Sequence, residues 1–232
     1  MSDRRNVVKS TAGPRTAIRP VGALHCTLGV MSLTKDQLSQ ATSFLENLDV
    51  RSLLSGTVRD SATTSEQGTT DTSSARLVVD LKGLESMHAP EKTSILYSGP
   101  FDKSERLYPF CLAVQQLFQD KGFLVEDDRK LKLHATIVNT IYAKGKKLPG
   151  RRASNQAQQN DSDAQGHGPN ANAPLKLDAR ALLDEYQDFA WAENVTLNRL
   201  AICEMGAKKI TDDEGKVIAE QYTEVASIGL PS

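Results

Sequence analysis

Two histidines of this chain are each followed, two positions later, by a threonine: Thr27 follows His25, and Thr136 follows His134. The ordinary pKa of an imidazole is about 6.5, so near neutral pH one ring can accept a proton while a second, protonated ring donates one. A threonine hydroxyl can donate a hydrogen bond to a phosphate oxygen. If the two motifs face one cleft, they supply an acid, a base and two phosphate donors, which suits in-line displacement at a phosphodiester. This chemistry needs no metal ion and no other cofactor.

Each motif lies in a stretch of alternating apolar and polar side chains, 24–30 for the first and 130–140 for the second. A period of two predicts a half-buried β-strand, on which residues two apart point the same way and lie about 6.5–7 Å apart. One histidine on such a strand is commonly a hydrogen-bonded structural residue, but the repeated pairing with threonine favours a functional site. Lys132 shares the face of His134 and is either a substrate contact or a solvated lysine. Tyr142 follows the second stretch and either stacks on a base of the substrate or packs against the protein.

The composition is that of a globular protein without a dominant charge. Its 232 residues suit one domain of two lobes or two small domains, and its formal net charge of −1 limits any contact with nucleic acid to local patches. The 3 cysteines include no CxxC pair, which argues against a disulfide framework or a structural zinc site and favours a reducing compartment. We find neither a signal peptide nor an apolar run of membrane-spanning length. We therefore expect a cytoplasmic or nuclear protein without membrane association; its oligomeric state stays open.

Changes in composition divide the chain into a polar N-terminal segment, 1–18, and one domain, 19–230, that carries both motifs. Within this domain, 55–75 is rich in Ser, Thr and Gly and is expected to be a flexible loop. The segment 144–176 begins basic and then becomes rich in Asn, Gln and Gly. Because it has too little apolar content to fold alone, we expect it to be a disordered insertion.

The basic start of this insertion, 144–152, allows three interpretations. Its side chains can contact an RNA backbone, serve as a localisation signal or form a solvated charge cluster, which is the commoner case. They are Lys144, Lys146, Lys147, Arg151 and Arg152. Two of these arginines also precede Ser154 with the spacing of a basophilic kinase site, at which a phosphate would change the local charge.

Apolar spacing and turn residues predict an α+β domain with helices packed on antiparallel sheets. Thr34 and Gln37 have the spacing of a capping box at the start of the first helix, Gly122 suits the end of the second, and Asp178 is expected to cap the third. A turn at 212–215 is expected to join the last two strands. Strands are expected near 24–31, 76–81, 94–97, 130–140, 195–204 and 222–228, and helices near 35–48, 104–121 and 178–189.

In their contexts the two motifs resemble the 2H phosphoesterase superfamily, which is related to RNA ligase-like and cyclic phosphodiesterase proteins. The resemblance rests on AIRPVGALHCTLGVMSL at 17–33, on KLKLHATIVNT at 130–140 and on ICEMGAK at 202–208. More narrowly, these stretches are similar to one branch of the superfamily. That branch holds the nucleotide-binding domain of a kinase-anchoring protein and the phosphoesterase domain of activating signal cointegrator complex subunit 1.

This resemblance implies a bilobal fold of pseudo-twofold symmetry with a central cleft. It also implies mononucleotide binding and activity on RNA ends, 2′,3′-cyclic phosphates or 2′,5′-linked oligonucleotides. By matching position, His25 and His134 become the catalytic pair, and Thr27 and Thr136 become the phosphate anchors. Members of the family usually begin with a strand and a helix before the first motif, whereas about 20 polar residues precede it here. The first lobe is therefore expected to lack a strand.

Two functions of different classes follow. The first is a metal-independent phosphoesterase that acts on RNA or oligonucleotide phosphodiesters by two-histidine acid–base catalysis. The second is a non-catalytic nucleotide- or RNA-binding subunit of a transcription-coactivator or repair complex. Both predict that a nucleotide binds in the cleft, but only the enzyme predicts turnover that survives EDTA and is lost when either histidine is replaced. The sequence leaves open which linkage is cut and which histidine is the base.

Overall fold

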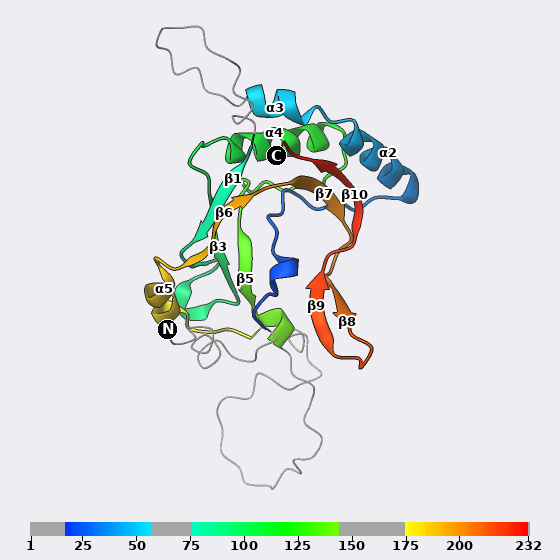
Figure 1. Ribbon diagram of the computed structural model, residues 1–232. Coiled ribbons are helices and arrows are strands. Elements are labelled where there is room, and N and C mark those ends of the chain that lie inside the picture. The colour runs from blue at the N-terminus through cyan, green and yellow to red at the C-terminus, as the bar shows by residue number, and fades with distance from the viewer. Residues whose placement is uncertain (1–16, 57–75, 144–174, 232) are drawn as a thin grey trace, which may run out of the picture.

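The structure is a computed structural model that describes residues 17–56, 76–143 and 175–231 (Figure 1). The polar N-terminal segment, the flexible loop and the disordered insertion expected from the sequence lie largely outside these residues, and so do the basic stretch and Ser154. Within the described part of the chain, no helix is long and apolar enough to cross a membrane.

Antiparallel sheets and packed helices make up the described residues, which confirms the α+β class. The helices are η3 (Val21–Ala23), α2 (Lys35–Glu46), α3 (Val50–Gly56), η5 (Pro90–Lys92), α4 (Leu107–Asp120), η6 (Thr140–Ala143) and α5 (Arg180–Tyr186), where η marks a 3-10 helix. The strands are β1 (Val78–Lys82), β2 (Glu85–Ser86), β3 (Ile95–Ser98), β4 (Pro100–Phe101), β5 (Ala135–Asn139), β6 (Ala190–Thr196), β7 (Arg199–Cys203), β8 (Lys208–Thr211), β9 (Val217–Gln221) and β10 (Glu224–Gly229).

Among the described residues, the strands pair in two three-stranded sheets and two two-stranded sheets. One larger sheet has the order β4-β1-β6 and the other the order β2-β3-β5, while β7 pairs with β10 and β8 with β9. Figure 1 shows α2, α3 and α4 gathered at one end of the molecule, beside β7 and β10, with the hairpin β8–β9 extending away from them. The segment that contains η3 runs between β5 and β9.

Buried apolar side chains form two clusters, which we call cluster A and cluster B. Cluster A joins α2, α3 and α4 to β1 and to the partly buried residues of β7 and β10; Leu45, Leu54 and Phe110 are among its most deeply buried members. Cluster B joins α5 to β3 and β5, and includes Leu96 and Val138. Removal of these side chains from water is the main contribution to the stability of each part of the fold.

Local signals for the first two long helices are confirmed. At the start of α2, the Thr34 hydroxyl accepts a hydrogen bond from the Gln37 backbone at 3.3 Å, and the Gln37 side chain accepts one from the Thr34 backbone at 2.9 Å. The α4 helix is followed by Gly122 at a φ of +70°, a conformation that favours glycine. Four apolar residues at helical spacing along α4 are buried: Leu107, Cys111, Val114 and Phe118.

The predicted cap of the third helix is wrong by one position. The first residue before α5 is Ala179, whose side chain makes no capping bond. Asp178 lies one residue earlier and accepts a hydrogen bond from the Arg180 backbone at 3.2 Å. It therefore still satisfies one free N–H group of the first turn, although it does so from outside the cap position.

Both motif stretches contain less strand than their alternation predicts. In 130–140 the strand β5 begins only at Ala135, so His134 precedes it, and 24–30 forms a single isolated bridge at Cys26. Neighbouring carbonyls of the first stretch bond to other partners instead of a strand: Leu28 O accepts from the Gln115 side chain at 2.6 Å, and Val30 O accepts from the Val125 backbone at 2.8 Å. These two carbonyls are thus satisfied without a ladder.

The last quarter of the chain contains more strands than predicted. The strand expected over 195–204 is two strands, β6 and β7. The last two predicted strands do pair, as β7 with β10, but the hairpin β8–β9 lies between them in the sequence. The turn expected at 212–215 is confirmed, because Gly215 N donates to Asp212 O at 2.9 Å, and it joins β8 to β9 rather than β7 to β10.

Candidate active site

One antiparallel bridge, between Cys26 and Ala135, brings the two motifs side by side although they are far apart in the sequence. In an antiparallel pair, the residue before one partner lies opposite the residue after the other. Extending this bridge by one residue in each direction sets the motif residues opposite one another, His25 to Thr136 and Thr27 to His134.

The motif residues therefore form a two-by-two array. Because side chains alternate along an extended backbone, all four lie on the face opposite Cys26 and Ala135. Directly opposed β-carbons are about 4.5–5.5 Å apart and diagonal ones about 7 Å apart. The two histidines occupy one diagonal of the array, and each has the other motif's threonine across from it.

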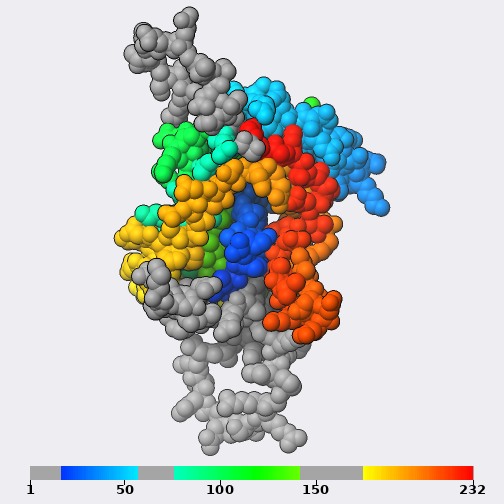
Figure 2. All heavy atoms as spheres, viewed as in Figure 1, coloured from blue at the N-terminus to red at the C-terminus, as the bar shows by residue number. Residues whose placement is uncertain are grey.

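Each motif lies where the chain passes from one apolar cluster to the other. Leu24 packs on cluster B and Leu28 on cluster A, while Leu133 packs on cluster A and Ile137 belongs to cluster B. The array therefore lies at the boundary between the clusters. Figure 2 shows the blue segment that carries the first motif framed by green and yellow residues on one side and by the orange-red hairpin β8–β9 on the other.

The two imidazole rings are held in the same way. His25 Nδ1 lies 2.9 Å from Ala23 O, and His134 Nδ1 lies 2.7 Å from Lys132 O, so each ring bonds to the carbonyl two residues earlier. A carbonyl oxygen only accepts hydrogen bonds, so Nδ1 must carry the proton in both rings. Nε2 is then the nitrogen that accepts a proton in the neutral ring and donates it after protonation.

Exposure of the array allows a ligand to reach it. His25 and Thr27 are exposed, while His134 and Thr136 are half-buried. Rings that are anchored at Nδ1 but accessible to solvent can both exchange protons and contact a substrate.

Two tyrosines that the sequence did not single out contact the histidines. Tyr222, just after β9, meets the His25 ring edge-on with the centroids 4.5 Å apart, and Tyr97 in β3 meets the His134 ring edge-on at 5.5 Å. Edge-to-face packing at these distances is favourable and restrains both rings. The spacing of either tyrosine from its histidine carries no signal in the sequence, because each contact depends on the folded arrangement.

Tyr97 connects further polar groups to the array. Its hydroxyl donates a hydrogen bond to Glu85 Oε2 at 2.6 Å, and the Lys132 ammonium lies 4.5 Å from the centre of its ring. Burial and the neighbouring Glu85 carboxylate raise the pKa of Tyr97, and Lys132 opposes them only in part. The phenol therefore stays protonated, as a donor, beyond its usual range.

The segment before the first motif is tied to two elements. Arg19 N donates to Ile137 O at 2.8 Å, and the Arg19 side chain, which is 5% exposed, lies 3.5 Å from Glu220 Oε2 in β9. At Gly22, an added β-carbon would lie 2.8 Å from the backbone oxygen of Glu220. The close approach of η3 to β9 therefore requires glycine at this position. This approach places the hairpin β8–β9 beside the first motif.

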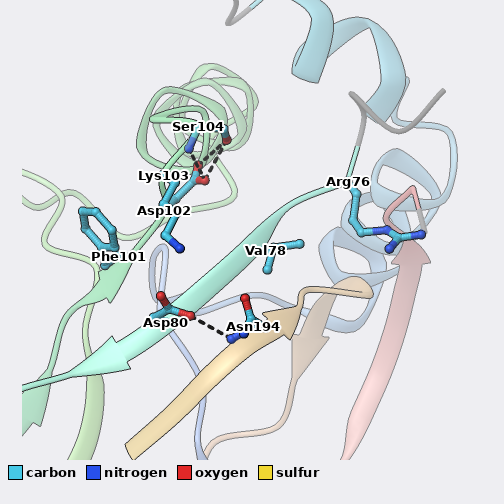
Figure 3. A pocket seen from close by; sticks show the side chains of 8 residues that line it. All are labelled: Arg76, Val78, Asp80, Phe101, Asp102, Lys103, Ser104 and Asn194. Atoms are coloured by element: carbon cyan, nitrogen blue, oxygen red, sulfur yellow. Dashed lines mark hydrogen bonds between the residues drawn. The ribbon is translucent and has the colours of Figure 1, made fainter. Parts of the chain in front are cut away.

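Two further candidates from the sequence, Lys132 and Tyr142, have different outcomes. Lys132 is exposed beside Tyr97 and near the array, as its shared face with His134 predicts. Tyr142 belongs to η6, and its side chain lies outside the described residues. A small pocket lies elsewhere, between Arg76, Asp80, Phe101 and Asn194, and none of the motif residues lines it (Figure 3).

Comparison with known proteins gives one family match and two relatives. The family described as the AKAP7 2'5' RNA ligase-like domain matches residues 4–220. The chain is 26% identical to uncharacterized protein C15D4.13c of Schizosaccharomyces pombe over 156 residues, and 29% identical to activating signal cointegrator 1 complex subunit 1 of Mus musculus over 133 residues.

These relatives are longer than the part that is matched. The first alignment covers 67% of this chain and 59% of the relative, and the second covers 55% of this chain and 33% of the relative. The family match extends over most of the chain and includes both motifs.

Proposed function

The chain belongs to the AKAP7 2'5' RNA ligase-like domain family, and from this premise we propose that it is a phosphodiesterase that works by two-histidine acid–base catalysis. Its substrates are RNA or oligonucleotide phosphodiesters, either 2′,3′-cyclic phosphates or 2′,5′-linked bonds. His25 and His134 are the catalytic residues, Thr27 and Thr136 bind the phosphate, and the reaction as proposed uses no metal ion. The proposed place of action is the cytoplasm or the nucleus.

In the proposed reaction, Nε2 of the neutral histidine removes a proton from the attacking water or hydroxyl. The oxygen forms a bond to phosphorus while the bond to the leaving oxygen breaks, and the protonated histidine gives its Nε2 proton to that leaving oxygen. The threonine hydroxyls donate to the non-bridging oxygens, which carry the developing charge. After one turnover the two rings have exchanged protonation states, and exchange with solvent resets them.

The observation that carries this proposal is that both imidazole rings have the same tautomer and the same hydrogen bond at Nδ1. Each Nδ1 is bonded to the carbonyl two residues earlier, so each ring presents Nε2, and the bridge register puts the rings on a diagonal. Diagonal β-carbons are about 7 Å apart, which keeps both histidines within reach of one phosphate group. A structural histidine would satisfy both nitrogens inside the protein; here His25 is exposed and His134 is half-buried.

A two-lobed domain with pseudo-twofold symmetry is part of the proposal. Clusters A and B support two lobes, because each lobe would then have its own apolar core. The two motifs, which cross between the clusters in opposite directions, support the symmetry. In this arrangement the substrate binds in a cleft at the boundary.

A second candidate function is that of a nucleotide- or RNA-binding subunit without catalysis. It is favoured by the mouse relative, whose name describes a subunit of a complex. In this case the array binds a phosphate, and the partners are components of a coactivator or repair complex. Binding would then depend on Thr27 and Thr136 as much as in the enzyme, but no bond would be cut.

The experiment that separates the two functions is cleavage of a small panel of substrates in EDTA. The panel holds a 2′,3′-cyclic nucleotide, a 2′,5′-oligoadenylate and a 3′,5′-linked RNA, and each is incubated with wild type, His25→Ala and His134→Ala. The enzyme is expected to cut the cyclic or the 2′,5′-linked substrate, and both variants are expected to lose this activity. If wild type binds nucleotide but cuts none of the three, the enzyme proposal is wrong and the binding subunit is supported.

A further inference from the structure

We propose that Tyr97 is a positioning residue that holds both His134 and Lys132 for the reaction at the motif array, an inference that rests on the proposed function. Tyr97 is 1% exposed and does not itself reach the substrate. It acts through His134 and Lys132, whose side chains both contact its ring.

The register of the sheet places Tyr97 beside the array, next to Thr136. Tyr97 in β3 pairs with Thr136 in β5, and Glu85 in β2 pairs with Tyr97. Paired residues of neighbouring strands share a face, so Glu85, Tyr97 and Thr136 form a row on the face that carries the motif residues. The row continues to His25 through the bridge that joins the first motif to β5.

Tyr97 gives the His134 ring its second point of support. One edge of the ring is fixed by the 2.7 Å bond from Nδ1 to Lys132 O, and the ring then meets Tyr97 edge-on at 5.5 Å with an interplanar angle of 73°. A hydrogen bond alone still permits the ring to rock about its axis. Two contacts from different directions fix both the tautomer and the direction of Nε2, which general acid–base catalysis needs.

The same tyrosine ring also restrains Lys132. The ammonium lies 4.5 Å from the ring centre, within the range of a cation–π contact. An exposed lysine otherwise samples many rotamers, so this contact concentrates the positive charge next to His134. There it can neutralise a non-bridging phosphate oxygen, which assigns Lys132 a part in binding the anionic substrate.

Glu85 in turn fixes Tyr97. The 2.6 Å hydrogen bond from the phenol to Glu85 Oε2 satisfies a hydroxyl whose residue is otherwise buried. Glu85 is exposed, so its substitution does not open the core. This makes Glu85 variants a way to loosen Tyr97 without removing its ring.

The test compares kcat and KM on the best substrate of the panel with 15N NMR signals of the histidine rings, which report the tautomer and need no turnover. Tyr97→Leu is expected to lower kcat about 100-fold through misplacement of His134. It is also expected to raise KM about 2- to 5-fold through release of Lys132. The His134 nitrogen signals should move toward a mixture of tautomers, while those of His25 stay in place. In a Lys132→Ala background, Tyr97→Leu should raise KM no further.

Glu85 variants keep the proposal testable if Tyr97→Leu does not fold. Glu85→Ala and Tyr97→Phe each remove the same hydrogen bond, and each is expected to lower kcat about 3-fold, with no further loss when combined. Glu85→Gln restores the rate, because its amide oxygen still accepts the bond. Tyr186→Leu is a matched control: this tyrosine is also buried, 5% exposed, but it packs on Phe189 and Trp191. It should reduce stability without moving the His134 signals.

The inference is overturned if Tyr97→Leu leaves kcat within about 3-fold of wild type, because the loss of a positioning contact implies a larger drop. It is also overturned if Tyr97→Leu moves the NMR signals of His25 and His134 alike. Tyr97 would then be a packing residue. If the wild type cuts no substrate, the proposed function fails, yet the NMR arm still decides whether Tyr97 positions His134.

Discussion

Thr136 offers a substitution that separates phosphate binding from stability. Replacing it with valine removes the hydroxyl and keeps a β-branched side chain of nearly the same shape, which suits its place in β5. The side chain is half-buried, at the array position across from His25. Thr136→Val should therefore leave the strand intact and alter only what the hydroxyl binds.

The size of the effect follows from the charge on the substrate. A hydrogen bond to a charged group contributes about 1.5–3 kcal/mol, and each 1.4 kcal/mol is a factor of about ten, so kcat/KM should fall about 10- to 140-fold. If the bond strengthens in the transition state, the loss appears mainly in kcat. The free energy of unfolding should change by less than about 1 kcal/mol.

The assay measures kcat and KM on the substrate that wild type cuts, together with urea unfolding of the same preparations. Thr196→Val is the matched control, because Thr196 is an exposed threonine at the end of β6. It should leave both quantities unchanged. The reasoning is refuted if Thr136→Val retains wild-type kcat/KM, or if its loss of activity is explained by an equal loss of folded protein.

Three further predictions concern the scaffold. Asp102→Ala should lower the free energy of unfolding by about 1–2 kcal/mol near neutral pH. The reason is that the Asp102 carboxylate accepts hydrogen bonds from three backbone N–H groups at the start of α4, those of Ser104, Arg106 and Leu107. Partial burial raises the pKa of this carboxyl, but bonds from Ser104 and from the backbone outweigh it and hold the pKa below its ordinary value. The stabilisation is therefore present above that ordinary value and is lost as the pH falls through the folded-state pKa, so urea curves of the two proteins should converge in acid. Gly122→Ala should lower the free energy of unfolding by about 1–2 kcal/mol. The whole effect comes from the φ of +70°, because an added β-carbon meets nothing within 4 Å. An unchanged midpoint of urea unfolding would contradict this. Gly22→Ala should reduce turnover more than Gly29→Ala, because its β-carbon meets backbone in β9 whereas that of Gly29 meets only the movable Leu124 side chain; equal turnover of the two variants would count against a role for η3.

Local signals in the sequence were sufficient for the elements that depend on neighbours along the chain. The capping box of Thr34 and Gln37, the buried stripe of α4 and the glycine after it all lie within one or two turns of helix, where spacing determines contact. The recurrence of His-x-Thr was likewise visible without a structure, and the family match includes both copies.

Features that depend on register or on distant partners were not predictable. Tyr97 meets His134 because β3 pairs with β5, and Tyr222 meets His25 because η3 lies against β9. In both cases the partners are far apart in the sequence. The strand expected at 24–30 is reduced to one bridge because Gln115 and Val125 take up its carbonyls. The hairpin β8–β9 was missed because it is largely exposed, so no apolar face marks its strands.

The central claim is that His25 and His134 act as a pair on one phosphodiester. The most direct measurement is kcat in EDTA for His25→Ala, His134→Ala and the double variant, with His88→Ala as a control at an exposed histidine outside the motifs. Each single variant should lose about 100-fold or more, the double variant should be little worse than either, and His88→Ala should match wild type. The claim is contradicted if either single variant keeps wild-type turnover, or if the losses of the two variants multiply in the double variant.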